Sequence, residues 1–210
     1  MRQSEVTSHF DSIAPKYDRY KKKNPDYYFA IKNALRDLVP PGKKILDFGC
    51  GTGEILAYLS PSFGVGYDIS PKMVEIARKK FERKAVTQSN KNLRFVTQLN
   101  AISGPFDFLL MIDVVEHLQD PQKAFRRLKE LMNKDSILIL SFVDSSWEPL
   151  LWILEKLGLK MPEGPHNRLL TGKVIEIGEQ VGLTCIKSQK IKIIEPIPFP
   201  LISLLVFKKK

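Results

Sequence analysis

The sequence predicts an α/β protein built on a doubly wound, mostly parallel β-sheet. Between residues 44 and 142, short apolar segments alternate with segments of helical periodicity, as strands connected by helices do. A glycine-rich turn follows the first expected strand, and such sheets bind ligands at the carboxyl ends of their strands. No linker divides the 210 residues, so a single domain, 1–210, is expected.

Residues 1–40 are expected to form an N-terminal helical cap. Pro15 disfavours one long helix over residues 4–23, so two short helical pieces are predicted there. Residues 25–38 carry apolar side chains at helical spacing, which predicts a helix that ends before Pro40-Pro41-Gly42.

The central part of the chain is expected to supply five strands. Ser70-Pro71 and Asp120-Pro121 each combine a good N-cap with a proline suited to the first helical position. The strand expected at 106–112 is apolar almost throughout, as expected where both faces are buried. Strands are predicted at 44–48, 63–67, 93–97, 106–112 and 136–142, and helices at 53–60, 71–84 and 121–132.

The pattern changes after residue 142. An apolar helix is expected at 147–159, followed by a loop rich in Pro and Gly, and then by a helix that Thr171 caps and Gly182 stops. Residues 183–194 and 201–207 are β-rich with no helix between them, which predicts an antiparallel pair. The short apolar tail is interpreted as a buried strand rather than a membrane anchor.

The formal net charge of +10 admits an acidic partner such as RNA, DNA or anionic lipid. The basic residues occur in small groups such as Lys21-Lys22-Lys23, which are interpreted as solvated helix faces. No apolar run is long enough to span a membrane, and no secretory signal is recognised. With Cys50 and Cys185 expected to be reduced, a cytoplasmic location is expected.

The turn after the first strand has glycine at alternate positions, Gly49, Gly51 and Gly53. Glycine lets a backbone turn tightly and approach a ligand, and the helix start that follows offers N–H groups to a carboxylate or phosphate. The dinucleotide fingerprint Gly-x-Gly-x-x-Gly requires a glycine at position 54, where this chain has Glu54. The Gly-Lys-Ser/Thr sequence of a P-loop is absent too. Asp68 follows the next expected strand, about 20 residues on, where a carboxylate can accept both ribose hydroxyls.

Three segments, 46–54, 66–78 and 106–121, together with the terminal hairpin, resemble class I S-adenosylmethionine-dependent methyltransferases of the ubiquinone- and menaquinone-biosynthesis-like type. The resemblance implies a seven-stranded sheet whose last strand is antiparallel. It also implies S-adenosylmethionine as the methyl donor and S-adenosylhomocysteine as the product.

The resemblance assigns roles to individual residues. Asp47 is the acidic residue of the glycine motif, Asp113 faces the cofactor's ammonium, and the Tyr17 hydroxyl binds the methionine carboxylate. Ile69 and Met73 line the adenine pocket. Asn100 stands where relatives carry a carboxylate for the adenine amino group, which is a departure from the pattern. The expected cofactor-binding residues are Tyr17, Asp47, Gly49, Cys50, Gly51, Gly53, Asp68, Ile69, Met73, Asn100 and Asp113.

His117 and His166 are the candidate catalytic residues, since an imidazole can take a hydroxyl proton near neutral pH. A packing role for His117 and an exposed loop position for His166 remain open. Asp113, Glu116 and His117 lack a second His or Cys set at ligand spacing, so no metal is expected.

The expected reaction is in-line methyl transfer to a small acceptor, which is apolar or quinone-like because Trp147, Trp152 and residues 196–200 lie on the acceptor side. Residues 1–23 and the helices and loop of 143–182 are expected to recognise the acceptor. A nucleic-acid methyltransferase and a non-catalytic cofactor-binding module are the alternatives. Whether oxygen, nitrogen or carbon is methylated stays open, as does the oligomeric state.

Overall fold

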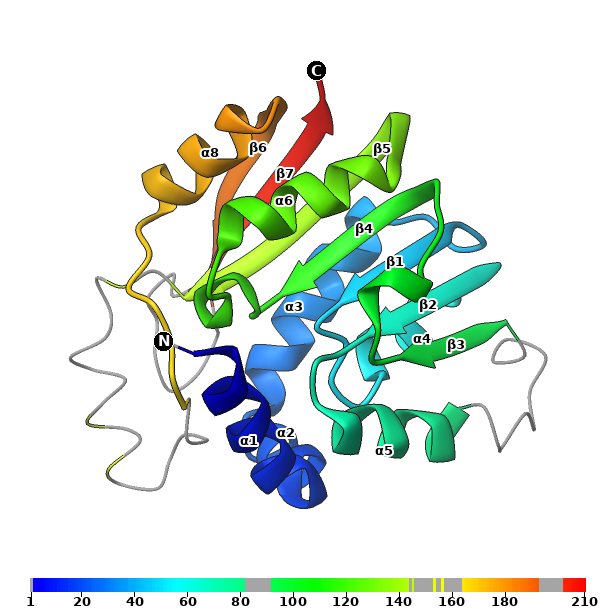
Figure 1. Ribbon diagram of the computed structural model, residues 1–210, viewed down its shortest axis with the longest axis vertical. Coiled ribbons are helices and arrows are strands. Elements are labelled where there is room, and N and C mark those ends of the chain that lie inside the picture. The colour runs from blue at the N-terminus through cyan, green and yellow to red at the C-terminus, as the bar shows by residue number, and fades with distance from the viewer. Residues whose placement is uncertain are drawn as a thin grey trace.

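The computed structural model describes residues 2–81, 92–143, 145, 153, 156, 164–192 and 202–210. One seven-stranded sheet, in the order β3-β2-β1-β4-β5-β7-β6, forms the centre of the molecule (Figure 1). The predicted doubly wound sheet is therefore confirmed. The strands are β1 (Lys44–Phe48), β2 (Phe63–Tyr67), β3 (Leu93–Val96), β4 (Phe106–Ile112), β5 (Met132–Val143), β6 (Leu183–Ile191) and β7 (Ile202–Lys209).

The sheet is parallel except at its last strand. β1 pairs in parallel with β2 and β4, while β7 runs antiparallel to both β5 and β6. The expected terminal hairpin is thus confirmed, and its second strand lies inside the sheet. Residues 202–207 are all buried, as expected of a strand with neighbours on both sides. Within the described ranges, no helix is both long and apolar enough to cross a membrane.

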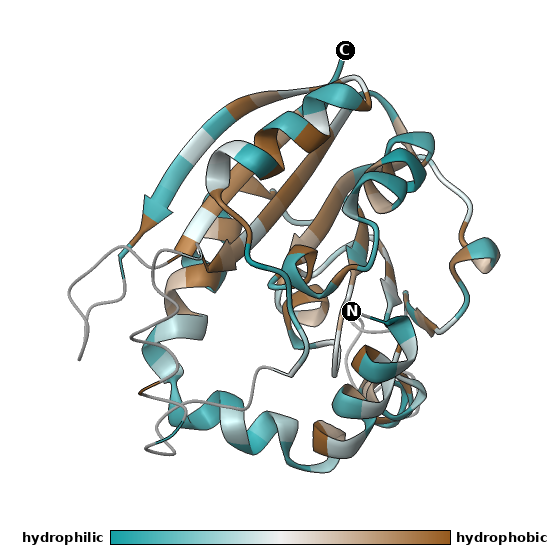
Figure 2. Cartoon of the chain, turned by 60° about the vertical axis from the view of Figure 1, so that its left-hand side comes forward, coloured by the Kyte–Doolittle hydropathy of each residue, from teal (hydrophilic) through white to brown (hydrophobic). Residues whose placement is uncertain are grey.

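Helices cover both faces of the sheet. The apolar faces of α3, α4 and α5 pack into one buried cluster, and those of α6 and α8 pack into another on the opposite face (Figure 1). Figure 2 shows the consequence, with hydrophobic residues concentrated on the strands and hydrophilic residues prominent on the helices. These helices are α3 (Pro25–Leu38), α4 (Glu54–Tyr58), α5 (Pro71–Phe81), α6 (Pro121–Glu130) and α8 (Thr171–Gln180).

The N-terminal segment forms two helices separated by a short turn. Helix α1 (Gln3–Ile13) and helix α2 (Tyr17–Lys23) flank a short 3-10 turn, η1 (Ala14–Lys16), which contains Pro15. The cap packs on α5 through a small apolar cluster in which Ile13, Ala14 and Met73 are buried. Short 3-10 turns η3 (Leu99–Ala101) and η4 (Val115–His117) follow β3 and β4.

Several boundaries differ from the prediction, and three of the differences have a structural explanation. Helix α4 begins at Glu54, because Gly53 has φ +81° and stands outside the helix as its N-cap, and it ends at Tyr58, before the predicted residue 60. Strand β5 begins at Met132, not 136, and a register shift against β4 accommodates the extra residues. Thr171 was expected to cap α8, but Leu170 is the N-cap and the Thr171 hydroxyl lies 2.9 Å from Ser203 Oγ instead.

The apolar helix predicted at 147–159 lies, apart from residues 153 and 156, outside the described residues. Trp147, Trp152 and residues 196–200, from which the sequence analysis infers an apolar acceptor, also lie outside the described residues.

Candidate active site

The glycine loop between β1 and α4 is held against the end of β2. The backbone N–H groups of Gly49 and Cys50 both donate to the Tyr67 carbonyl, at 2.7 and 2.9 Å. Gly49, Gly51 and Gly53 all have positive φ values, between +53° and +83°. That conformation costs an L-residue about 1–2 kcal/mol, which explains why glycine recurs here.

Two of the three glycines, Gly49 and Gly53, also face a neighbour that leaves no room for a side chain, and the third, Gly51, faces a close one. A Cβ on Gly49 would collide with Val114, and one on Gly53 would lie 2.7 Å from Phe95 Cε1. A Cβ on Gly51 would approach Tyr17 Cε1 to 3.3 Å. The loop is therefore packed between β3, the turn after β4 and the N-terminal cap.

Asp68 connects β2 to this loop. One carboxylate oxygen accepts from the N–H of Gly51 and the other from the N–H of Ser70, both at 2.8 Å. Each oxygen keeps a second acceptor position, so the carboxylate can still receive two further hydroxyls. Burial raises the pKa of Asp68 to about 6, although the two N–H donors oppose the change.

The predicted adenine-side residues are only partly brought together. Ile69 directly follows Asp68 and is half-buried. Met73 is 1% exposed and belongs to the apolar cluster beneath α1. Asn100 is exposed in η3, and no hydrogen bond among the described residues joins it to Asp68.

Asp47, at the base of the loop in β1, is 2% exposed. Its Oδ2 atom has no hydrogen-bond partner among the described residues. Burial, together with the nearby charge of Asp68, raises the pKa of Asp47 to about 7, while Lys21 opposes the change. A buried carboxylate oxygen without a partner is costly, so this atom marks a place where a donor is missing.

Asp113 follows β4 in a left-handed conformation with φ +56°. Its side chain accepts from Ser141 Oγ at 2.8 Å, and its own N–H donates to the Ser141 carbonyl. Burial, together with the negative charge of this carboxylate, raises the pKa of Tyr27. Strained backbone held in place by such contacts is common at functional sites.

The cap is fastened to the glycine loop by Asp18. Its carboxylate accepts from Thr52 Oγ1 at 2.7 Å and forms an ion pair with Lys80 of α5. Lys80 also reaches Glu54 at 3.1 Å, so one ammonium joins α2, α4 and α5. A second fastening joins Asp11 of α1 to Ser70 Oγ at 2.5 Å.

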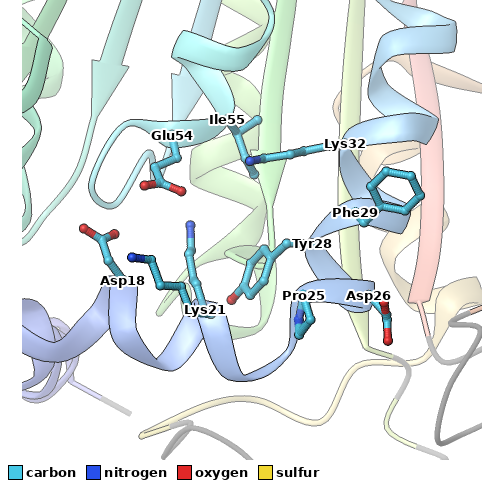
Figure 3. A pocket seen from close by; sticks show the side chains of 10 residues that line it. Asp18, Lys21, Pro25, Asp26, Tyr28, Phe29, Lys32, Glu54 and Ile55 are labelled. Carbon is cyan, nitrogen blue, oxygen red and sulfur yellow. The ribbon is translucent and has the colours of Figure 1, made fainter.

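Lys21 is half-buried, whereas its neighbours Lys22 and Lys23 are exposed as the sequence predicts. Its ammonium lies 4.8 Å from the ring centroid of Tyr17 and 4.9 Å from that of Tyr28. Burial lowers the pKa of Lys21, and the surrounding carboxylates oppose that change. Lys21, Tyr28 and Glu54 line an open hollow of about 560 Å³ between α2, α3 and α4 (Figure 3).

The two candidate catalytic histidines lie close together. The ring centroids of His117 and His166 are 6.4 Å apart, and Phe10 of the cap packs edge-on against His117 at 5.1 Å. His117 Nδ1 lies 2.8 Å from the Pro165 carbonyl, and His166 Nδ1 lies 3.0 Å from the Gly164 carbonyl. Because a carbonyl only accepts, each Nδ1 carries the proton, and in a neutral ring Nε2 is then the basic nitrogen.

Sequence reasoning missed the residues that hold the cap onto the loop. Asp18, Thr52 and Lys80 are far apart in the sequence, and none has a motif that marks its partners. For Lys21 a signal exists, since Tyr17 and Tyr28 flank it in the sequence, but only the helix orientations bring both rings to one ammonium. Cys50, predicted among the cofactor-binding residues, is buried, with its sulfur close to Gly66.

Comparison with known proteins agrees with this geometry. Residues 20–188 match the methyltransferase domain family. An uncharacterized protein of Methanocaldococcus jannaschii is 28% identical over 180 residues, which cover 85% of this chain and 82% of that protein. A ubiquinone biosynthesis O-methyltransferase of Cereibacter sphaeroides is 29% identical over 144 residues, which cover 63% of this chain and 57% of that protein. The chain thus spans little more than half of that curated relative.

Among solved structures, magnesium protoporphyrin IX methyltransferase of Synechocystis, crystallised with S-adenosylhomocysteine, has the same fold. The TM-score is 0.72 over 100% of both chains, at 22% sequence identity. The family match covers most of this chain, and the strand order is that of class I methyltransferases. The chain therefore belongs to the methyltransferase domain family, and it is a class I S-adenosylmethionine-dependent methyltransferase.

Proposed function

We propose that this methyltransferase methylates a hydroxyl oxygen of a small, largely apolar acceptor, with His117 as the general base. The observation that carries the proposal is the contact between His117 Nδ1 and the Pro165 carbonyl at 2.8 Å. This contact fixes the orientation of the imidazole ring and leaves Nε2 as the basic nitrogen. His117 lies in η4, shortly after strand β4, which ends beside the glycine loop.

The residues of the loop fit S-adenosylmethionine. Asp47 offers a buried carboxylate oxygen that lacks a donor, which suits an ammonium group. Asp68 offers a carboxylate with acceptor positions to spare for a diol. Gly49, Gly51 and Gly53 carry no Cβ, so a ligand can come close to the backbone of the loop. These assignments support the predicted cofactor-binding residues.

When bound, S-adenosylmethionine would supply a methyl group activated by its positively charged sulfur, and the acceptor oxygen would receive this methyl group in exchange for the sulfur. His117 Nε2 takes the hydroxyl proton and becomes part of an imidazolium, whose Nδ1–H stays on the Pro165 carbonyl. Phe10 packs edge-on against the His117 ring and so helps to fix its position. The protein otherwise contributes alignment and the exclusion of water.

Oxygen is favoured as the methylated atom for two reasons. A base is needed for a hydroxyl and not for a neutral amine, and the ubiquinone biosynthesis relative is by name an O-methyltransferase. A nucleic-acid acceptor has less support, because several basic side chains already bind within the protein. Lys79 pairs with Glu75, and Arg127 donates to the Ile102 carbonyl at 2.9 Å.

The test measures S-adenosylhomocysteine formation with a panel of small phenols and quinols, small amines and RNA. His117→Gln should lower kcat by roughly 10²- to 10⁴-fold with a phenolic acceptor, while the affinity for S-adenosylhomocysteine stays unchanged. His166→Gln is the matched variant from the same cluster and should retain most activity. A larger loss in His166→Gln would move the base to His166, and turnover of amines or RNA alone would reject the proposed acceptor class.

A further inference from the structure

A short loop, residues 164–169, runs beside the turn that carries His117, and it is fixed at both ends. At one end a Cβ on Gly164 would lie 2.6 Å from His9 Nε2, so helix α1 packs directly on the loop. At the other end Leu169 is buried in the core cluster that α6 and α8 cover. The course of the loop is therefore set by packing at its ends, independently of its contacts with His117.

Between these ends, Asn167 binds the backbone on both sides of His117. Its N–H donates to the Glu116 carbonyl at 2.6 Å, and its side-chain Nδ2 donates to the Leu118 carbonyl at 2.7 Å. A carbonyl only accepts, so the contact with Leu118 requires the NH₂ group of the amide. An ionised carboxylate or an alkyl side chain at position 167 could not make this bond.

The same loop holds the His117 ring, because the Pro165 carbonyl accepts from Nδ1 at 2.8 Å. The turn η4 has only three residues, and its own hydrogen bonds run to the carbonyls of Val114 and Val115. Asn167 therefore adds two bonds that the turn does not make for itself. Together the three contacts join the backbone and the ring of His117 to one piece of chain, so a shift of η4 against the loop would break the contact with Pro165.

We propose that Asn167 is a positioning residue, which clamps the backbone around His117 and thereby keeps Nδ1–H on the Pro165 carbonyl and Nε2 free of its proton. This rests on the proposed function, in which His117 is the general base. Without the clamp the ring is no longer held to Pro165, and the proton of the neutral ring moves to Nε2, which a histidine in water protonates preferentially. The basic atom is then Nδ1, at a different place in the site. A displacement of about 1 Å in a reacting group can cost about 10²-fold in rate.

Nitrogen-15 NMR of the full chain, labelled at histidine, measures the tautomer directly. The chain has 3 histidines, and the signals that disappear in His117→Gln are those of His117. At about pH 8.5, well above the ordinary histidine pKa, the wild type should show His117 with its proton on Nδ1. Asn167→Ala should move most of this proton to Nε2. Asn167→Asp, which keeps the shape and removes the donor, should do the same.

Asn133→Ala is the matched control for the loss of an amide that binds backbone. The Asn133 side chain accepts from the Asp135 N–H at 2.8 Å, beside the start of β4 and not beside the turn that follows its end. This variant should leave the His117 tautomer unchanged.

A double-mutant cycle in the methyl-transfer assay separates positioning from folding. With a phenolic acceptor, Asn167→Ala should lower kcat roughly 10- to 100-fold and change the Kd of S-adenosylhomocysteine by less than about 2-fold. In His117→Gln no base remains to be positioned, so adding Asn167→Ala should lower kcat by less than about 2-fold further.

The outcomes separate this inference from the proposed function. An unchanged His117 tautomer in the Asn167 variants would overturn the inference, and so would an equal loss of kcat with and without His117, which a purely structural role produces. Either result leaves the base intact, because His117→Gln alone tests it. Full activity of His117→Gln would reject the base, and the tautomer would then decide whether Asn167 holds the ring. Asn167→Asp provides the same measurements if Asn167→Ala does not fold.

Discussion

Replacing Asp47 by Asn should stabilise the ligand-free protein at alkaline pH and at the same time weaken cofactor binding. Burial raises the pKa of Asp47 from its ordinary value of 3.8 to about 7, so the folded protein favours the protonated form. For a group whose folded pKa is raised, the favourable contribution is complete below the unfolded pKa and is lost as the pH rises through the folded one. The wild type should therefore lose stability between about pH 4 and pH 7 through this residue.

The magnitude follows from the two pKa values. One pKa unit corresponds to about 1.4 kcal/mol, so retaining Asp47 costs the folded state about 2 kcal/mol at pH 5 and about 4 kcal/mol at pH 8. Asn does not titrate, and its advantage over Asp should grow by about 2–3 kcal/mol between these pH values. Asp68, whose pKa is also raised, is present in both proteins and contributes to both curves.

Urea denaturation of the ligand-free proteins at pH 5 and pH 8 measures the difference. Asp135→Asn, at an exposed position in β5, controls for the loss of a carboxylate as such. Calorimetry at pH 8 should show S-adenosylhomocysteine bound roughly 10- to 100-fold more weakly by Asp47→Asn, because an amide cannot replace a charged acceptor. An Asn advantage that is equal at the two pH values, or an unchanged affinity, would refute the reasoning.

Two further substitutions test how the loop and the cap are held. Gly53→Ala should cost about 2–4 kcal/mol of unfolding free energy in urea, because a positive φ and a Cβ 2.7 Å from Phe95 act together. Gly42 has φ +77°, but a Cβ there would have no atom within 4 Å, so Gly42→Ala should cost only about 1–2 kcal/mol. Equal losses in the two variants would show that the Phe95 ring moves aside at little energetic cost. Asp18→Asn should speed amide hydrogen exchange in residues 2–23 without changing exchange in the sheet, since it removes the ion pair to Lys80. Unchanged exchange in the cap would mean that the apolar contacts under α1 hold it alone.

The parts of the fold that are predictable from sequence are those with local signals. The strand at 106–112 is recognisable because both of its faces are apolar, and Ser70 is recognisable as an N-cap, which the structure confirms with a 3.2 Å bond from the Met73 N–H. Thr171 carries the same local signal and is misassigned, because Ser203 from a distant strand takes its hydroxyl. Local chemistry thus sets the elements, and tertiary contacts decide between neighbouring boundaries.

The residues of the candidate site likewise include some with a local sequence signal and others that only tertiary contacts reveal. The glycine loop and Asp68 are found in the sequence because one turn and one strand end contain them. The contacts of Lys21 are not found, because they depend on Tyr17 and Tyr28 meeting one ammonium. The pairing of His117 with Pro165 likewise joins segments 48 residues apart.

The central claim is that the glycine loop and Asp68 form the S-adenosylmethionine site of this methyltransferase. Titration calorimetry of the full chain with S-adenosylmethionine and with S-adenosylhomocysteine tests it most directly. Saturable binding of both ligands at one site per chain is predicted, and Asp68→Ala should abolish it while the sheet stays folded. Absence of binding by the wild type, or near-normal affinity in Asp68→Ala, would contradict the claim.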